Sequence, residues 1–334
     1  MIEVVIPAHN AETFLRETLE SVAAQTRLPL QVTVVDDRSR DGTRGVAKRA
    51  AAELAPPLRI KVVATEGPPG PSAARNTAIR ASRAEFIALL DADDLFLPTH
   101  LAELAGLLEA NPRAVLAFGD STLFESATGR VLVPSHHAST RLVNLPTEPA
   151  SGGGWTLGRA GFRHLLIEPR VATSACLFRR KEALAAGLFD EAMMFTEDSD
   201  FFLRLALLGE FVFTRAPVGR KRIHGTNLSN PRNRVRFMHG AARLAVRLDA
   251  IAAGSGEPRL TVGAEDRMAI QRNLGRTFDR WLYEASLTCL ADYREAARDA
   301  ARARYGHLAL RPRHVGRMLR TLLGGRLRQQ SRSN

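Results

Sequence analysis

Three aspartates stand close together at the end of an apolar run. The stretch FIALLDADDLFLP covers residues 86–98 and contains Asp91, Asp93 and Asp94. Carboxylates this close repel one another unless a positive group lies among them, because a nearby like charge disfavours the ionised form. A neighbouring arginine or a metal ion would supply that charge, and a solvated acidic turn is the plain alternative. A hard cation such as Mg²⁺ or Mn²⁺ prefers oxygen ligands of this kind.

Two further acidic groups lie at predicted element boundaries. VVDDRSRDGT places Asp36 and Asp37 at the end of an apolar run, and TEDSDFFLR places Glu197, Asp198 and Asp200 at the start of a helical pattern. An acid at a strand end could accept hydrogen bonds from a nucleotide or cap the next helix. The second group suits either the positive end of a helix dipole or general-base chemistry. Neither G-x-G-x-x-G nor G-x-x-x-x-G-K-[ST] is present, which disfavours dinucleotide oxidoreductases and P-loop enzymes.

An alternation of strands and helices must position these acids. Apolar runs predict strands at 2–8, 30–37, 58–65 and 84–91, and periodic patterns predict helices at 11–26, 41–54 and 70–82, the last with Ser72 as its cap. This order predicts a doubly wound, mostly parallel α/β sheet with helices on both faces. Such sheets bind ligands at the carboxyl ends of their strands. We therefore expect Asp36, Asp37 and Asp91 to meet at one crevice.

The second half of the chain changes character. We expect a helix at 98–111, a strand at 114–125, an irregular segment at 126–169, a strand and helix over 173–193, a helix at 197–209 and short strands over 210–225. Beyond about residue 230 the patterns are helical. In the last helix Val315, Met318, Leu319, Leu322 and Leu323 share one face among arginines, which fits a basic amphipathic helix on an anionic membrane. An ordinary packing helix or a homodimer contact is the alternative.

Composition limits the possible classes of protein. The chain has 334 residues, a formal net charge of +12 and two cysteines, Cys176 and Cys289, without metal-ligand spacing. The cysteines fit a reducing compartment. We see no signal peptide and no apolar run long enough to span a membrane, so the cytoplasm is expected, with peripheral contact at the inner membrane face left open. The positive charge suits an anionic partner, but no motif for specific nucleic-acid recognition is present.

Five blocks, taken in order, resemble the family-2 glycosyltransferases, which have the GT-A fold. They are VVIPAHNAETFLRETLESVAAQT, VVDDRSRDGT, GPSAARNTAIRAS, LLDADD and TEDSDFFLR, and together they cover roughly residues 1–225. The resemblance implies a GT-A catalytic domain at 1–228, with a mostly parallel, Rossmann-like sheet that binds a nucleotide sugar. A helical region, either membrane-associated or oligomerising, is expected at 229–334.

The resemblance also implies roles on the donor side. Pro7, Ala8 and Glu12 match the segment that lies against the nucleoside, and Asp37 matches the residue that accepts from the base. Arg75 matches a basic residue near the base and the phosphates.

The D-x-D signature of this family falls on Asp91 and Asp93. Asp93 is the expected ligand of Mn²⁺ or Mg²⁺, and Asp91 is expected at the ribose or as a second ligand. His224, in RKRIHGTNLS, matches a histidine that contacts the metal or the diphosphate in related enzymes, although a lone histidine is often structural. Arg220, Lys221 and Arg222 add positive charge nearby.

On the acceptor side, Asp198 matches the family's catalytic base. It would deprotonate an acceptor hydroxyl that attacks the anomeric carbon in one inverting step. Glu197 and Asp200 are expected to orient it or to hold the acceptor. Thr173 is placed along the sugar pocket, and Trp155, in the Gly-rich insertion SGGGW, could stack on an acceptor sugar or anchor the loop.

These expectations describe a metal-dependent, inverting enzyme of the hexosyltransferase type. It would transfer one sugar from a nucleotide-diphosphate donor, UDP favoured, to a glycan or lipid-linked acceptor in bacterial surface glycan or glycolipid assembly. Single transfer is favoured because the Q-x-x-R-W block of processive synthases is absent. Two alternatives stay open, a nucleotidyltransferase and a non-catalytic nucleotide-sugar-binding protein on the same fold. A nucleotidyltransferase would need a basic, Gly-rich loop after the first strand, where this chain has PAHNAE.

Overall fold

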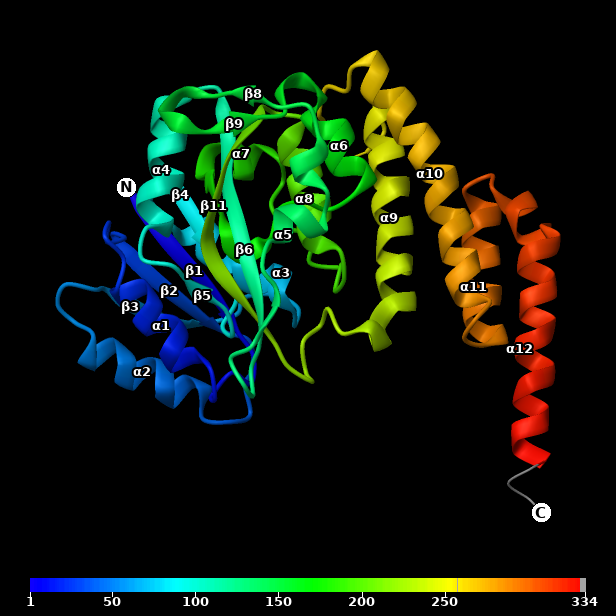
Figure 1. The fold of residues 1–334 in the computed structure, drawn as a ribbon, viewed down its shortest axis with the longest axis horizontal. Helices are drawn as coiled ribbons and strands as arrows, with labels where there is room; N and C mark the ends of the chain where they lie inside the picture. The colour runs from blue at the N-terminus through cyan, green and yellow to red at the C-terminus, as the bar shows by residue number, and fades with distance from the viewer. Residues whose placement is uncertain (257, 331–334) are drawn as a thin grey trace. The chain divides into compact units, whose positions relative to one another are not determined.

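The computed structural model describes residues 1–256 and 258–330. The chain divides into two compact units, Met1–Gly225 and Thr226–Asn334, each treated by itself below. The first unit is an α/β fold around one sheet, and the second is helical in its described part (Figure 1).

The sheet of the first unit is mixed. Its order is β3-β2-β1-β4-β10-β6-β11-β9-β8, with β5 beside β11 and β7 beside β6. Neighbours from β3 to β4 are parallel, as are β6 and β11, whereas β10 runs antiparallel between β4 and β6. The strand bounds are β1 Ile2–Ala8, β2 Gln31–Asp36, β3 Ile60–Ala64, β4 Phe86–Leu89, β5 Leu95–Phe96, β6 Ala114–Glu125, β7 Val131–Val133, β8 Glu148–Pro149, β9 Trp155–Thr156, β10 Cys176–Arg179 and β11 Glu210–Ile223.

The order of the strands creates the crevice. Strand β1 pairs with β2 on one side and with β4 on the other, so the order reverses at β1. Such a switch point leaves a gap outside the carboxyl ends of the strands. The ends of β2 and β4 carry Asp36–Asp37 and Asp91, as the sequence predicts. The α/β fold class with a mostly parallel central region is thereby confirmed, with β10 as an antiparallel strand in its middle.

Helices cover the sheet because its central strands are apolar and buried. On β1, Ile2, Val4 and Ile6 belong to a buried cluster with residues of α1, α2 and α4, whereas Val5 faces the opposite side by the two-residue period of a strand. The helix bounds in this unit are α1 Leu15–Ala23, α2 Thr43–Glu53, α3 Pro71–Ala81, α4 His100–Ala110, α5 His136–Ser139, α6 Gly161–Ile167, α7 Arg180–Ala185 and α8 Glu197–Ala206.

The first helix starts later than the sequence pattern suggests. It was expected from residue 11, and α1 begins at Leu15. Tertiary hydrogen bonds account for the difference. The backbone N–H groups of Asn10, Ala11 and Glu12 donate to the side chains of Ser39, Thr43 and Asp41. These contacts hold residues 10–12 as a loop against the segment that follows β2.

Three other local expectations are corrected. Ser72 does not cap α3, because Gly70 occupies the cap position and the Ser72 hydroxyl donates to the Met193 carbonyl at 3.3 Å. The segment 126–169 contains the short elements β7, α5, β8, β9 and α6. Residues 210–223 form one long strand, β11, with irregular register near Pro217 instead of several short strands.

The second unit has its own core. Its helices are α9 Arg234–Ala252, α10 Ala264–Ala285, α11 Leu290–Arg302 and α12 Pro312–Gln330. Phe278, Trp281 and Leu282 of α10 lie at the centre of the buried cluster. On α12, Met318 is buried while Val315 and Leu319 are exposed, and the side chains of Leu322 and Leu323 lie outside the described part. Within the described residues, we find no helix with the length and apolar character needed to cross a membrane.

Candidate active site

The three aspartates after β4 form a tight turn in which each carboxylate has its own partner. The Asp94 N–H donates to the Asp91 carbonyl at 3.0 Å. Arg75 Nη2 donates to Asp91 Oδ1 at 2.9 Å, and His224 Nε2 lies 2.8 Å from Asp93 Oδ2. The positive group sought for this cluster is therefore Arg75 of α3, and His224, just after β11, is the partner of Asp93.

Asp94, which the sequence left without a role, fastens the turn to two other segments. Its carboxylate accepts from the Ser174 hydroxyl at 2.7 Å and from the Arg222 N–H at 2.9 Å. Burial, followed by repulsion from Asp93, raises the pKa of Asp94 to about 8. The same Ser174 hydroxyl accepts from the Asp91 N–H at 3.0 Å. Asp94 and Ser174 therefore fix the position of the neighbouring acids.

Asp93 and His224 are brought together as the sequence predicts. Burial, and then the charge of Asp91, raise the pKa of Asp93, while His224 opposes the shift. The His224 ring stacks on Phe14 with centroids 4.8 Å apart. Its orientation toward Asp93 is therefore set by packing as well as by the hydrogen bond.

Arg75 lies between the aspartates after β4 and the acidic start of α8. Its side chain is buried, and its two terminal nitrogens donate to Asp91 at 2.9 Å and to Glu197 Oε1 at 3.0 Å. Burial by itself lowers the pKa of Arg75, but the charges of Asp91 and Glu197 outweigh it and raise that pKa above its ordinary value. The guanidinium also lies over the Phe189 ring. Arg75 therefore joins the turn after β4 to the start of α8.

The first turn of α8 presents Asp198 to the same crevice. Thr196, just before the helix, has a left-handed backbone with φ of 62°. Asp198 Oδ2 accepts from the Thr173 hydroxyl at 3.2 Å, and its Oδ1 accepts from the Ser199 N–H at 2.6 Å. Burial, and then the charge of Asp198, raise the pKa of Glu197 to about 7. The two neighbouring acids therefore have different surroundings: Glu197 is held by Arg75, and Asp198 is half-buried at the crevice.

Asp200 does not lie in the crevice, which corrects its expected acceptor-side role. It is fully buried and pairs with Arg204, whose Nε donates to Asp200 Oδ2 at 3.0 Å. Arg204 also donates to the Leu188 carbonyl at 2.6 Å. An acceptor cannot reach this carboxylate, because the pair is buried in the interior under α8.

Trp155 also lies away from the acids. It sits on β9 opposite Phe213, near the start of β11, whereas His224 follows the other end of that strand. The Arg215 guanidinium covers its ring at 4.2 Å from the centroid. The ring face is therefore occupied by a side chain, and stacking on an acceptor sugar in this crevice is not supported.

The residues expected near the nucleoside lie where β1 and β2 end. Ala8 is buried, and its carbonyl accepts from the Asp37 N–H at 2.8 Å. Asp37 Oδ2 accepts from the Gly70 N–H at 2.7 Å, just before α3. Glu12 is exposed and accepts from the Gly42 N–H at 2.7 Å, just before α2. Pro7 precedes Ala8 on β1, so these residues gather at one edge of the sheet.

Lys221 is the member of the RKR run that faces the carboxylates. It lines a small cavity with Asp91, Asp94 and Thr173. Burial lowers the pKa of Lys221, but the surrounding carboxylates, first among them Asp94 and Asp91, raise it overall. Arg220 also borders this cavity, but its guanidinium and that of Arg222 lie over the Phe124 ring, and Arg222 pairs with Glu17. Alternation along a single strand separates Lys221 from its two neighbours, and that signal was available in the sequence.

The candidate metal ligands suit a divalent cation in part. Asp91, Asp93 and His224 offer two carboxylates and an imidazole, and burial followed by the charge of Asp91 raises the pKa of Asp93. Mg²⁺ usually binds through one or two carboxylates together with substrate phosphates. No group of three or more histidine, cysteine or acidic side chains in the described chain is arranged to hold a metal by itself. These three side chains are therefore of the chemical type that can supply part of the ligand set of such a cation.

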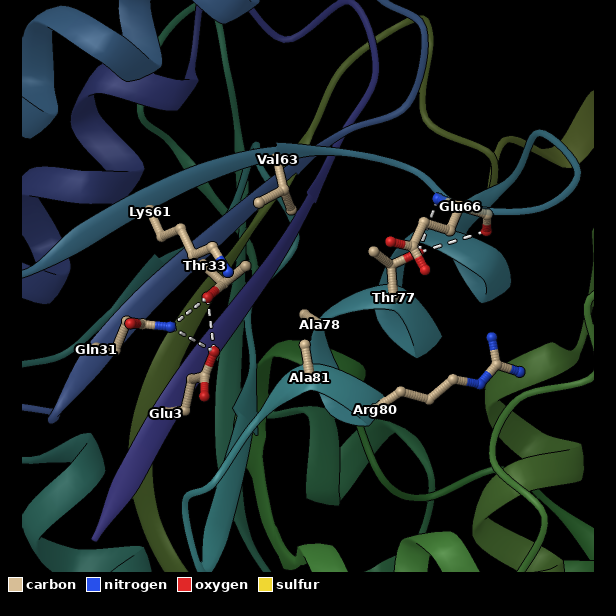
Figure 2. Close-up of a pocket in the computed structure, with 10 residues that line it drawn as sticks. All are labelled: Glu3, Gln31, Thr33, Lys61, Val63, Glu66, Thr77, Ala78, Arg80 and Ala81. Carbon is tan, nitrogen blue, oxygen red and sulfur yellow. Dashed lines mark hydrogen bonds between the residues drawn. The ribbon is translucent and has the colours of Figure 1, made fainter.

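A larger cavity lies elsewhere, between β1–β3 and α3 (Figure 2). It has a volume of about 320 Å³ and is lined by polar side chains that include Glu3, Gln31 and Thr33. Glu3 Oε1 accepts from the Thr33 hydroxyl at 2.6 Å and from Gln31 Nε2 at 3.1 Å (Figure 2). None of the candidate site residues lines this cavity.

The family model for glycosyl transferase family 2 matches residues 3–165. This match assigns residues 3–165, just under half of the chain, to glycosyltransferase family 2. The match includes Asp37, Arg75, Asp91 and Asp93, and it ends before Asp198 and His224.

Two curated relatives illustrate the family. The chain is 29% identical over 205 residues to the uncharacterized glycosyltransferase EpsJ of Bacillus subtilis, covering 61% of this chain and 55% of EpsJ. It is 33% identical over 101 residues to the Escherichia coli UDP-Glc:alpha-D-GlcNAc-diphosphoundecaprenol beta-1,3-glucosyltransferase WfgD, covering 30% of this chain and 38% of WfgD. The matched part thus spans about half or less of each relative.

Two solved structures share the fold. S. aureus TarS 1-349 in complex with UDP-GlcNAc matches with a TM-score of 0.57 at 18% identity, over 97% of this chain and 92% of that one. The mannosyltransferase PcManGT from Pyrobaculum calidifontis, in complex with GDP-Man and Mn²⁺, matches with a TM-score of 0.53 at 20% identity, over 96% and 86%. These likenesses show that the chain shares the fold of these two transferases.

Proposed function

We propose that the chain transfers a single sugar from a nucleotide-diphosphate sugar to an acceptor hydroxyl, with inversion at the anomeric carbon. The observation that carries the proposal is the meeting of two acidic groups, Asp91–Asp93 and Asp198, in one crevice where Arg75, Ser174 and neighbouring Thr173 tie them together. UDP is the favoured nucleotide, since WfgD is named for a UDP-sugar and TarS binds UDP-GlcNAc. WfgD's name also supports a bacterial glycan or lipid-linked acceptor.

The donor would lie along the ends of β1, β2 and β4. In this proposal Asp37 accepts from the base, while Pro7, Ala8 and Glu12 line the nucleoside. Asp93, Asp91 and His224 would hold Mn²⁺ or Mg²⁺, which PcManGT's Mn²⁺ complex supports. When bound, such a cation neutralises charge on the departing diphosphate. Arg75 holds Asp91 in place, and Lys221 lies among the acids at the crevice.

The acceptor side is assigned to the start of α8. Asp198 would take the proton from the acceptor hydroxyl as its oxygen attacks the anomeric carbon. The Thr173 hydroxyl, 3.2 Å from Asp198 Oδ2, orients that carboxylate. Glu197 turns toward Arg75 and so leaves Asp198 as the acid that faces the crevice.

A donor panel tests the proposal. We expect release of the nucleotide from one or more of the UDP-, GDP- and dTDP-sugars in the presence of Mn²⁺ or Mg²⁺, and loss of that release in a chelator. Asp198→Asn should retain donor binding and lose transfer by roughly 10²–10⁴-fold, the usual contribution of a general base. A chain that binds no nucleotide sugar with either metal would refute the proposal, and unchanged transfer in Asp198→Asn would exclude that residue as the base.

A further inference from the structure

The net charge of the chain comes from its second unit. Residues 226–334 contain 21 arginines, no lysine and nine acidic residues, which together give +12, the formal net charge of the whole chain. Residues 1–225, which contain the candidate active site, have equal numbers of basic and acidic residues. A general preference for arginine would raise the charge of both units and does not explain this separation. The second unit therefore has a positive field that attracts anionic partners.

Part of this charge forms a stripe along α10. Arg272, Arg276 and Arg280 stand four residues apart, so their side chains leave one side of the helix over a length of roughly 12 Å. All three are exposed, and within the part of the chain that the structure describes their side chains have no ion-pair or hydrogen-bond partner. Their guanidinium groups can therefore be reached by an external anion.

The start of α12 extends this stripe. Arg311 Nη1 donates to Asp279 Oδ1 of α10 at 3.0 Å, and Arg313 pairs with the other oxygen of the same carboxylate. The side chains of these two arginines remain 45% and 54% exposed. Further along α12, the Arg317 guanidinium lies 4.2 Å from the centroid of the Tyr283 ring, one turn after Asp279 on α10. These contacts place the arginines of the two helices side by side.

The resulting α10–α12 surface is positive and partly apolar. Its arginines are Arg272, Arg276, Arg280, Arg311, Arg313 and Arg317. Leu310, directly before α12, is 78% exposed, and Tyr283 is also exposed. A soluble polyanion would meet the charge alone, whereas a lipid bilayer combines anionic headgroups with an apolar layer that accommodates such side chains. The combination therefore favours a bilayer as the partner.

We propose that the α10–α12 surface binds the headgroups of an anionic phospholipid bilayer. The arginines donate to lipid phosphates, and the exposed Leu310 and Tyr283 side chains enter the headgroup layer. Met318, which the sequence places on a membrane face of α12, is buried, so the contact is assigned to two helices instead of α12 alone. The inference does not depend on the proposed function, because none of the residues assigned to the donor or to the acceptor belongs to this surface.

Sedimentation with vesicles tests the inference on the full chain without donor or metal. Vesicles of phosphatidylcholine alone would be compared with vesicles of phosphatidylcholine and phosphatidylglycerol in equal parts, and a DNA duplex would serve as a soluble polyanion. We expect the anionic vesicles to bind at least about tenfold more tightly than the neutral ones. This binding should weaken at least about tenfold when NaCl is raised from about 0.1 M to about 1 M, which shortens the Debye length to about 3 Å.

Paired substitutions test the location of the contact. Arg276→Gln with Arg280→Gln should weaken binding to anionic vesicles at least about tenfold, because each basic residue near such a surface contributes roughly a fivefold factor. Arg276→Lys with Arg280→Lys keeps the charge and should stay within about threefold of the wild type. The matched control is Arg294→Gln with Arg298→Gln, which removes the same charge from the face of α11 opposite its buried Ala296. This control should weaken binding less than about threefold, because charges beyond a Debye length are screened.

Leu310→Ser separates a bilayer from a soluble polyanion. It should weaken binding to anionic vesicles at least about threefold, since less apolar surface enters the bilayer, and leave the affinity for DNA unchanged. Equal binding to the two kinds of vesicle, or equal weakening by the α11 control, would overturn the inference. Failure of the lysine pair to retain binding would also count against it. DNA that binds more tightly than the anionic vesicles and displaces them would assign the surface to a nucleic acid instead.

Discussion

Removing the Arg75 guanidinium should both destabilise the protein and loosen its crevice. In Arg75→Met, Glu197 would remain 8% exposed without its cation, and Asp91 would lose the donor that lies 2.9 Å from Oδ1. Methionine retains much of the apolar stem, so the change removes the charge, its hydrogen bonds and the contact of the guanidinium with the Phe189 ring. The perturbation therefore tests the link between the turn after β4 and α8.

The expected magnitude follows from burial. Breaking a buried ion pair by removing one partner typically costs about 3–5 kcal/mol, because the other charge stays behind. For a unit of this size that corresponds to a fall in melting temperature of roughly 6–20 °C. The pKa of Glu197, about 7 with Arg75 present, should rise further in the variant, since Arg75 lowers it. The loss of stability should thus be smaller at pH 6, where Glu197 is largely protonated, than at pH 8.

Urea unfolding of a double-mutant cycle measures this coupling. We expect Arg75→Met and Glu197→Gln to be coupled by at least about 1.5 kcal/mol at pH 8, as contacting buried residues are. The matched cycle is Arg179→Met with Glu85→Gln, an ion pair at 3.2 Å whose carboxylate is 57% exposed, and its coupling should be within about 1 kcal/mol of zero. Equal coupling in the two cycles, or an Arg75→Met penalty that does not depend on pH, would refute the reasoning.

Three further predictions follow from the site. Asp93→Ala should abolish Mn²⁺-dependent binding of UDP in titration calorimetry, and retained metal dependence would remove Asp93 from the ligand set. Asp200→Asn should lower the free energy of unfolding by about 3–5 kcal/mol, because it breaks a fully buried ion pair. The KM of the folded enzyme for its acceptor should stay unchanged. A raised KM would restore an acceptor-binding role for Asp200. The pKa of Glu197 is about 7 in the folded chain against an ordinary 4.5, so the native state holds the proton that the unfolded state releases. The contribution of this group to the free energy of unfolding should therefore fall by about 3 kcal/mol between pH 4.5 and pH 7. Urea unfolding at several pH values measures this change. The prediction is contradicted if the unfolding free energies of the wild type and of Glu197→Gln depend on pH with the same slope.

The fold was predictable because its signals are local and repeated. Four apolar runs alternate with three amphipathic segments up to residue 91, and parallel topology follows from that order. The position of the acids followed from the same argument, since the carboxyl ends of β2 and β4 share one edge. The start of α1 was missed because side chains beyond β2 bind the N–H groups of residues 10–12, a tertiary effect that helical periodicity does not contain.

The orientation of individual side chains was harder to predict. Asp200 reads as one of three acids at a helix start, but Arg204 stands four residues later, and this spacing is the usual signal for an intrahelical pair. Lys221 was grouped with two arginines because 210–225 was expected to be several short strands. In the single strand β11, Arg220 and Arg222 share the face that packs on Phe124, and Lys221 faces the acids.

The proposed donor and acceptor sides share a common support in the segment before β10. Ser174 contacts the Asp91 N–H and the Asp94 carboxylate, while its neighbour Thr173 contacts Asp198. Arg75 makes a second link between Asp91 and the start of α8. A displacement of either side is therefore transmitted to the other through two short paths of hydrogen bonds. The distance between the donor acids and the candidate base is then a property of the folded scaffold, which is what a single in-line displacement requires.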